Sequence, residues 1–285
     1  MRDLFAAISK DTRAATLSEY TQYLRDRNGE MNLQERTLSK REETIKKYET
    51  PPKAIERMNE AEFRAQYRAF DRRNPPNPEM LLLLALVKVN AAEAYGVSVN
   101  FERTKSRAIK ENSDAELMIL CEEGYHTRIL LSSANRYGIE VTEPYSPPSA
   151  LRIMIGGIAT APMAIARPLT LAGEIIATLM FQKLLELAPR VLKHAPATRD
   201  AIEERLVEIC ADEHGHISFN RIHSSPAVLA ETRLILPATA RIMGATVFQE
   251  IAALGAFPSN VMADLPQLTD PRRIPEAVRR QVFLA

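Results

Sequence analysis

Two copies of one short pattern stand out in the sequence, and both read acid-Glu-x-x-His. They are Glu122-Glu123-Gly-Tyr-His126 and Asp212-Glu213-His-Gly-His216. A glutamate and a histidine three apart on a helix project from the same face, so each helix can offer a carboxylate and an imidazole to one metal site. In a chain with 36 acidic residues and 5 histidines, chance predicts about 0.06 copies of the pattern. The repetition therefore indicates a metal centre.

A site for two metal ions in a helical bundle needs one further carboxylate from each of two other helices. Glu93 and Glu174 are the candidates. Glu174 lies in the apolar segment LTLAGEIIATLM, where a buried carboxylate without a partner would cost a large desolvation free energy. A metal ion beside it removes that cost. The predicted metal ligands are Glu93, Glu123, His126, Glu174, Glu213 and His216.

The spacing of the glutamates supports this assignment, because ligands at one height in an antiparallel helix pair lie equally far from the turn between them. The midpoint between Glu174 and Glu213 falls at residues 193 to 194, beside the helix-breaking sequence His-Ala-Pro. The midpoint between Glu93 and Glu123 is residue 108, in a polar stretch. Both helix pairs can therefore turn where the sequence permits.

Glu102 competes with Glu93, since its midpoint with Glu123 falls at residues 112 to 113. It lies among basic residues on a face predicted to be solvated, so Glu93 is preferred. Four ionised glutamates also balance the charge of two divalent cations, which allows the cluster to be buried. Oxygen-rich ligation with one imidazole per metal favours two iron ions over zinc, with manganese as the alternative in one or both positions.

The helices that would carry these residues are visible in the apolar pattern. Only 10 glycines and long stretches with a 3.6-residue apolar period predict an all-α protein. Residues 1–78 are highly charged and end in a proline-rich breaker, which predicts a helical N-terminal extension. Residues 79–223 are expected to form a four-helix bundle, and residues 224–285 to add helices and an irregular tail that pack on it.

Local signals place the four helices of the predicted bundle. The first begins at Met80, and the second follows Ser113, which with Glu116 forms a Ser-x-x-Glu capping box. The third covers residues 169 to 192, and Thr198 is expected to cap the fourth. The long, proline-bearing connection over residues 137 to 162 suits a crossover between two helix pairs.

The overall composition restricts partners and compartment. Thirty-seven basic and 36 acidic residues nearly cancel, so no strong field is expected to hold nucleic acid or an anionic membrane. Charges near the N-terminus argue against a secretory signal, and Pro162, Arg167, Pro168 and Glu174 interrupt the apolar segment that most resembles a membrane span. Two cysteines without a CxxC pair exclude a disulfide framework, so a reducing cytoplasm is expected.

With paired motifs and lone glutamates, residues 80 to about 223 resemble the ferritin-like soluble diiron-carboxylate proteins. That superfamily includes bacterial multicomponent monooxygenases, acyl carrier protein desaturases, ribonucleotide reductase small subunits and bacterioferritins. The resemblance implies that Glu122 and Asp212 hydrogen-bond histidine ligands, with Asp212 reaching His126 across the bundle. It also implies a catalytic role for Thr178, where several monooxygenases place a threonine in the oxygen pocket.

Within the superfamily, the segment after His216 is similar to the p-aminobenzoate-type N-oxygenases. Those enzymes carry an extra histidine one turn before the last ligand glutamate, and this chain has Ile209 there, so six protein ligands are expected. Ile209, Phe181 and His223 are candidates for the substrate pocket, although for His223 a polar helix end is the simpler interpretation. His214 is expected to point away from the ligands, either to solvent or behind them.

These features predict a non-heme diiron oxygenase that uses dioxygen and an external electron donor to oxidise a small organic molecule, by hydroxylation or N-oxygenation. The alternatives are an iron-oxidising protein of the bacterioferritin kind and a diiron desaturase or carbon-carbon cleaving oxidase. The extensions on both sides of the bundle favour an enzyme, because they can build a pocket. The substrate and the oligomeric state stay open, a homodimer being one alternative.

Overall fold

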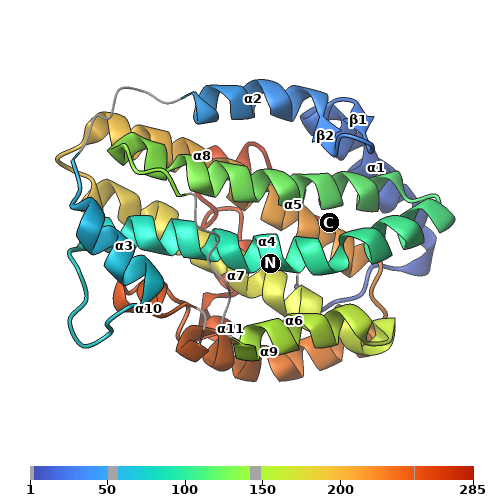
Figure 1. Ribbon diagram of the computed structural model, residues 1–285. Coiled ribbons are helices and arrows are strands. Elements are labelled where there is room, and N and C mark those ends of the chain that lie inside the picture. The colour runs from blue at the N-terminus through green and yellow to red at the C-terminus, as the bar shows by residue number, and fades with distance from the viewer. Residues whose placement is uncertain (1–2, 51–56, 142–148, 247) are drawn as a thin grey trace.

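Most of the chain is helical in the computed structural model, which describes residues 3–50, 57–141, 149–246 and 248–285 (Figure 1). The expected all-α class is confirmed, because helices account for 74% of the chain and the described residues contain one sheet, of two strands. Those strands, β1 (Met31–Asn32) and β2 (Thr37–Leu38), pair antiparallel with Met31 opposite Leu38.

Four long helices form the centre of the molecule. They are α4 (Pro78–Lys110), α5 (Asp114–Ser132), α7 (Met163–Val191) and α8 (Pro196–Ile222). Each packs against two of the others, in the cyclic order α4, α5, α8, α7. Short turns connect α4 to α5 and α7 to α8, whereas the connection from α5 to α7 contains η1 (Ala134–Tyr137) and α6 (Ser149–Thr160).

The remaining helices surround these four. On the N-terminal side they are α1 (Lys10–Asn28), α2 (Ser39–Glu49) and α3 (Glu60–Arg68). On the C-terminal side they are α9 (Pro226–Thr246), α10 (Gln249–Ala253), α11 (Val261–Asp264), α12 (Pro266–Thr269) and α13 (Glu276–Arg279). Helices α1 and α2 pack on α5, α1 also packs on α8, and α9 packs on α7. The largest apolar core lies between α1, α2 and the four long helices.

Capping explains where α4 and α5 begin. The side chain of Asn77 accepts the amide proton of Met80 at 2.9 Å, and Pro78 occupies the first helical position, where its missing N–H costs nothing. Ser113 Oγ accepts the amide proton of Glu116 at 3.4 Å. The Glu116 carboxylate binds Arg107 instead of returning to Ser113, so one half of the expected capping box forms.

Several boundaries differ from expectation. Helix α8 begins at Pro196, and its N-cap residue Ala195 makes no side-chain cap, so Thr198 lies inside the first turn, fully buried, and is not the cap. Proline at the first position sets the helical φ angle two residues earlier. The described part of the crossover contains a helix, α6, and the tail beyond Phe257 contains three helices of 4 residues each between non-helical stretches.

Two helices, α4 and α7, are long and apolar enough to cross a membrane, by length and composition alone. Within the most apolar window of each, 67% of α4 and 56% of α7 is buried inside the protein. A core helix of a bundle meets the same criterion of length and hydropathy.

Candidate metal centre

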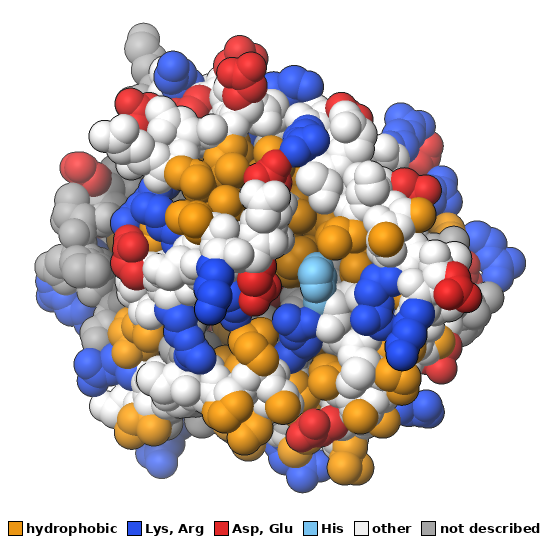
Figure 2. All heavy atoms as spheres, turned by 90° about the vertical axis from the view of Figure 1, so that its right-hand side faces the viewer, with side chains coloured by type: hydrophobic (Ala, Val, Ile, Leu, Met, Phe, Trp, Pro, Cys, Tyr) orange, Lys and Arg blue, Asp and Glu red, His pale blue; other side chains and the backbone are white. Residues whose placement is uncertain are grey.

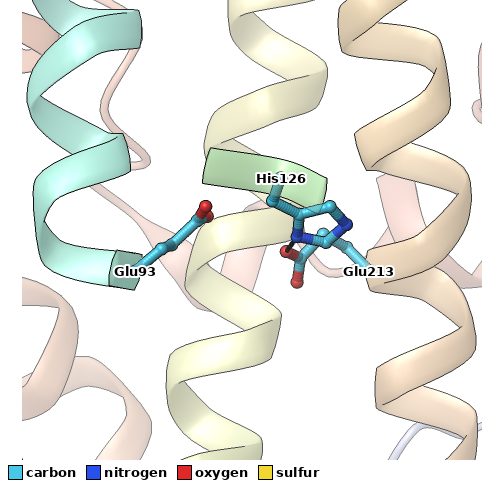
Figure 3. Close-up of side chains that lie close together, drawn as sticks. All are labelled: Glu93, His126 and Glu213. Atoms are coloured by element: carbon cyan, nitrogen blue, oxygen red, sulfur yellow. Dashed lines mark ion pairs between the residues drawn. The ribbon is translucent and has the colours of Figure 1, made fainter. Parts of the chain in front are cut away.

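The six predicted ligands meet in the middle of the four long helices. Glu93 comes from α4, Glu123 and His126 from α5, Glu174 from α7, and Glu213 and His216 from α8. They form two groups, and within each group one ligand atom per residue lies within 4.8 Å of the others. The groups are Glu93, His126 and Glu213 (Figure 3), and Glu123, Glu174 and His216.

Glu102, the competitor of Glu93 on α4, lies away from this cluster. Its side chain is 75% exposed and pairs with Arg36 at 3.4 Å. The preference for Glu93, which rested on the charges around Glu102, therefore agrees with the positions of the two side chains.

Two of the four glutamates lie between the groups. Glu123 places one carboxylate oxygen 3.1 Å from Nδ1 of His216 and the other 3.7 Å from Nδ1 of His126. Glu213 likewise lies 3.4 Å from Nδ1 of His126 and 4.0 Å from Nδ1 of His216. Glu93 and Glu174 each belong to one group. The arrangement therefore offers two positions for bridging carboxylates and two for terminal ones.

Buried polar atoms without hydrogen-bond partners converge at the cluster. They are Nδ1 of both histidines and Oε2 of both Glu93 and Glu213. Buried polar atoms in folded proteins almost always have a partner, because leaving one unpaired costs about 1–3 kcal/mol. Lone pairs on two imidazoles and several carboxylates are the donor set of a divalent iron or manganese ion. The residues present therefore fit two such ions.

The charges of the cluster lead to the same conclusion. Burial raises the pKa of the Glu93 carboxyl well above its usual range, and burial together with the Glu213 carboxylate does the same for the pKa of Glu174. Burial lowers the pKa of His126, but the hydrogen bonds that its ring donates to Asp212 and nearby glutamates outweigh this effect and raise that pKa overall. Without a cation, the cluster retains protons among its carboxylates, and divalent ions can replace them.

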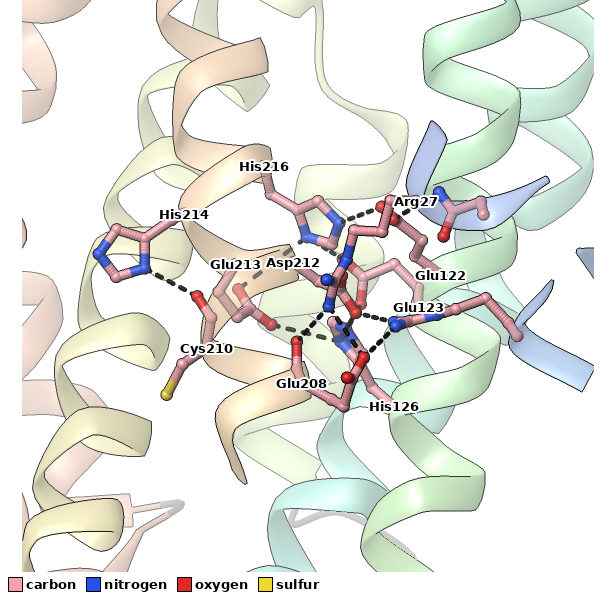
Figure 4. Close-up of polar contacts among 12 residues, drawn as sticks. Arg27, Glu122, Glu123, His126, Glu208, Cys210, Asp212, Glu213, His214 and His216 are labelled. Atoms are coloured by element: carbon pink, nitrogen blue, oxygen red, sulfur yellow. Dashed lines mark hydrogen bonds and ion pairs between the residues drawn. The ribbon is translucent and has the colours of Figure 1, made fainter. Parts of the chain in front are cut away.

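A second carboxylate holds the far side of each imidazole (Figure 4). Asp212 Oδ2 lies 3.2 Å from Nε2 of His126, and Glu122 Oε2 lies 3.1 Å from Nε2 of His216. Nε2 therefore carries the proton that it donates to the carboxylate, which leaves the Nδ1 lone pair free for a metal. The contact between Asp212 and His126 across the bundle is the one that the family resemblance implied.

Helices α1 and α2 hold these two carboxylates in turn. Arg27 Nε donates to Asp212 Oδ1 at 2.6 Å, and Arg41 also pairs with Asp212. Both arginines contact Glu208, one turn before Asp212, so two cations balance two anions. On the other side, Asn28 Nδ2 donates to Glu122 Oε1 at 2.7 Å. The sequence does not connect these residues to the cluster, because the charges near the N-terminus are typical of a solvated helix face.

The expected oxygen-pocket and substrate-pocket residues lie elsewhere. Thr178 is fully buried and donates its hydroxyl proton to the backbone carbonyl of Glu174 at 2.7 Å. Phe181 and Ile209 are fully buried in the main apolar core. None of the three lines the two cavities that adjoin the carboxylates. The reason is that these cavities open on another side of α7, toward α6 and α9.

The structure also places His223 and His214, the two other histidines considered near the site. The ring of His223 lies tilted against that of Phe219 with centroids 4.5 Å apart at the end of α8, outside the lining of both cavities. Burial, with a smaller contribution from Arg167, lowers the pKa of His223 to about 4. His214 is buried, with Nδ1 2.7 Å from the carbonyl oxygen of Cys210. It points away from the ligands as expected, but it does not reach solvent.

The two cavities meet at the carboxylates. One, of about 260 Å³, has an apolar wall that includes Val89, Ala177, Met180 and Phe248. The other, of about 320 Å³, runs between α4, α5 and α7. The carboxylates of Glu93, Glu123 and Glu174 line both. A small molecule in either cavity would therefore lie against the candidate metal centre.

Comparisons of the chain with protein-family models, with curated proteins and with solved structures gave no match. The case for a function therefore rests on the geometry of this site.

Proposed function

We propose that the protein is a non-heme diiron oxygenase, built on a ferritin-like bundle, that activates dioxygen to oxidise a small organic substrate. The observation that carries this proposal is the pair of three-residue groups whose unpartnered imidazole and carboxylate atoms converge in a buried site beside two cavities. Ferrous ions in these positions would supply the electrons and open coordination positions that reduce dioxygen.

The residues of the chain have separate tasks in this proposal. Nδ1 of His126 and of His216 would each hold one metal ion, because the carboxylates on the far side fix the proton on Nε2. Glu123 and Glu213 would bridge, and Glu93 and Glu174 would complete the two positions. Burial of both imidazoles and of Glu213 lowers the local dielectric constant, which strengthens the interaction between carboxylates and cations.

The cavities support an oxygenase over the main alternative, an iron-oxidising protein of the bacterioferritin kind. Volumes of about 260 and 320 Å³ with largely apolar walls suit a small organic molecule. A protein whose only substrate is iron has no use for an apolar cavity beside the metals. A desaturase or a carbon-carbon cleaving oxidase would use the same ligands. Identification of the product therefore distinguishes these enzymes from an oxygenase.

Two further parts of the proposal rest on the sequence. Reduction of dioxygen beyond the two electrons that the substrate gives requires an external electron donor, which we expect to be a separate protein or small molecule. A cytoplasmic location agrees with two buried cysteines that are both in the thiol form.

Anaerobic titration with ferrous ion tests the metal centre. We expect saturation near two iron ions per chain, in agreement with the two ligand groups. Air and a large excess of ferrous ion are then added, and the products are separated by gel filtration. An oxygenase should consume dioxygen without building a mineral core, whereas oxidation of many iron ions per chain inside a large hollow assembly would contradict the proposal.

A further inference from the structure

The larger cavity follows matching faces of two long helices. On α7 it is lined by Arg167, Thr170 and Glu174, and on α5 by Glu116 and Glu123 among others. Residues spaced by three, four and seven positions lie on one face of a helix. Arg167 and Glu174 are seven residues apart, as are Glu116 and Glu123, which corresponds to about 10 Å along each helix axis. The cavity is therefore elongated, with the candidate metal centre at its inner end.

The outer end of this cavity carries three arginines, Arg103, Arg107 and Arg167. Arg107 pairs with Glu116. Among the described residues, Arg103 and Arg167 form no ion pair. Each donates to a backbone carbonyl oxygen, Arg103 to that of Ala161 at 3.2 Å and Arg167 to that of His223. The exposed guanidinium of Arg103 and the half-buried one of Arg167 thus line the mouth without an ion-pair partner in the part of the chain that the structure describes.

Arg167 is the more constrained of the two. It is half-buried, and burial together with the positive charge of Arg107 lowers its pKa. Glu116 and Glu111 act in the opposite direction without cancelling the effect, and Arg13 adds a further positive charge. Partial burial of a charge without a neighbouring anion costs free energy, so an anion at this position would lower the free energy of the site.

The walls between the mouth and the metal centre carry apolar side chains, Val97, Ile119, Ile158 and Phe219 among them, beside uncharged polar ones such as Asn100 and Thr104. The mouth lies toward the end of the molecule where α4 ends and α5 begins, at the right of Figure 1. On that face, basic side chains stand around exposed hydrophobic ones (Figure 2). A ligand for this cavity therefore needs a charged end and an apolar body.

We propose that the substrate is a small amphipathic acid. Its carboxylate, or another oxyanion, binds Arg167 and Arg103 at the mouth, and its apolar body extends about 10 Å inward to Glu123 and Glu174. A planar guanidinium matches such an oxyanion through two parallel hydrogen bonds. That the bound acid is a substrate rests on the proposed function. The acid-binding site itself depends only on the cavity and the arginines. The same positive mouth would repel ferrous ions entering by this route.

Matched pairs of probes test the proposal by isothermal titration calorimetry. Octanoate is compared with octan-1-ol, and 4-phenylbutanoate with 4-phenylbutan-1-ol, because each pair differs mainly in the charged group. We expect at least one acid to bind about tenfold more tightly than its alcohol. A parallel titration with octyl phosphate distinguishes the two charged groups. If octyl phosphate binds more tightly than octanoate, the oxyanion site is supported and its ligand carries a phosphate.

Variants locate the binding site of the acid. Arg167→Gln should remove most of the preference for acid over alcohol and leave binding of the alcohol within about twofold. Arg103→Gln provides a second test should the first variant fold poorly. Arg241→Gln, at an exposed position of α9 outside both cavities, is the matched control and should keep the preference.

The titrations are run on both the metal-free and the anaerobic ferrous protein, because a carboxylate could also bind iron directly. An arginine-dependent preference in the metal-free protein supports the mouth as the anion site. Equal affinities within both pairs, or a preference that persists in both arginine variants, would overturn it. Iron titration is a separate readout. A protein that prefers the acid but does not bind two iron ions would refute the diiron centre alone. A protein that binds two iron ions but shows no preference for the acid would refute the acid site alone.

Discussion

Asp212 of α8 and His126 of α5 meet across the bundle, with Oδ2 3.2 Å from Nε2. The same carboxylate receives Arg27 and Arg41 on its other side. Asp212 therefore connects the N-terminal helices to the imidazole, and it fixes the ring position from which Nδ1 faces the candidate metal centre.

Substitution of Asp212 by asparagine should lower the affinity for ferrous ion by about 10- to 100-fold, because the carboxylate that orients His126 loses its charge. Anaerobic iron titration measures the affinity, and circular dichroism verifies the helical content. Glu208→Gln is the matched control, since Glu208 binds the same two arginines but no histidine. Equal loss of iron in the two variants would mean that Asp212 acts through the arginines and not through His126.

Glu93 and Glu102 provide a direct comparison within α4. Glu93→Ala should leave fewer than two iron ions bound, because it removes a ligand of the group with His126 and Glu213. Glu102→Ala should leave the iron content unchanged, since that side chain is 75% exposed and pairs only with Arg36 among the described residues. Iron is measured after desalting. Retention of both ions in Glu93→Ala would remove Glu93 from the ligand set.

The stabilisation by metal should depend on pH. Raised pKa values of Glu93, Glu174, His126 and His216 mean that these four groups hold more protons in the folded, metal-free protein than in the unfolded chain. This difference begins above pH 4.5 for the glutamates and above pH 6.5 for the histidines, the ordinary values of these groups. The contribution of these four groups to the stability of the metal-free protein should therefore fall as pH rises through this range.

Metal ions replace those protons, so the gain in Tm on adding manganous ion should be larger at about pH 8 than at about pH 6. Differential scanning fluorimetry measures both states. Glu93→Gln should reduce the pH dependence of the metal-free protein, because it removes one of the retained protons. A gain in Tm that shrinks as pH rises would contradict the description of the cluster.

The two thiols should be unreactive in the folded protein. Burial raises the pKa of Cys121 to about 11 and raises the pKa of Cys210 as well, so little of the nucleophilic thiolate exists at neutral pH. Iodoacetamide should label neither cysteine before denaturation and both afterwards, as counted by mass spectrometry. Ser98→Cys, at an exposed position of α4, is the positive control. Rapid labelling of the native thiols would be incompatible with their burial.

Short spacings along the chain predicted most of the candidate ligand set. Glu123 and His126 share a helix face by their separation of three, and the break near residue 194 sets the height of Glu174 opposite Glu213. The turn between α4 and α5 lies at residues 111 to 113, where the midpoint for Glu102 falls, so Glu93 was identified by the charges around Glu102 and not by spacing. The partners of Asp212 could not be found in this way. Arg27 and Arg41 lie 185 and 171 residues away from it, and no periodicity connects charges so distant in the chain.

The cavity residues were misplaced for a different reason. Thr178 and Phe181 follow Glu174 by four and seven positions and were expected to share its direction. Beyond Glu174, the cavity lining on α7 continues at Ala177 and Met180 instead. That side of α7 faces α9, and the sequence predicted α9 as a helix without indicating where it packs. Fold class and ligands therefore followed from pattern, while the shape of the cavity depended on tertiary packing.

The separation of Arg27 and Arg41 from Asp212 along the chain also determines when, during synthesis, the contacts between them can form. The ribosome releases α1 and α2 early, but the carboxylate that they hold emerges 171 residues after Arg41. Half of the ligands, on α7 and α8, are likewise synthesised in the second half of the chain. Contacts of such long range form late in folding, because the loop that they close is large. If the cluster binds metal as proposed, uptake would follow the synthesis of α8, and until then Arg27 and Arg41 of the nascent chain would lack the carboxylate of Asp212.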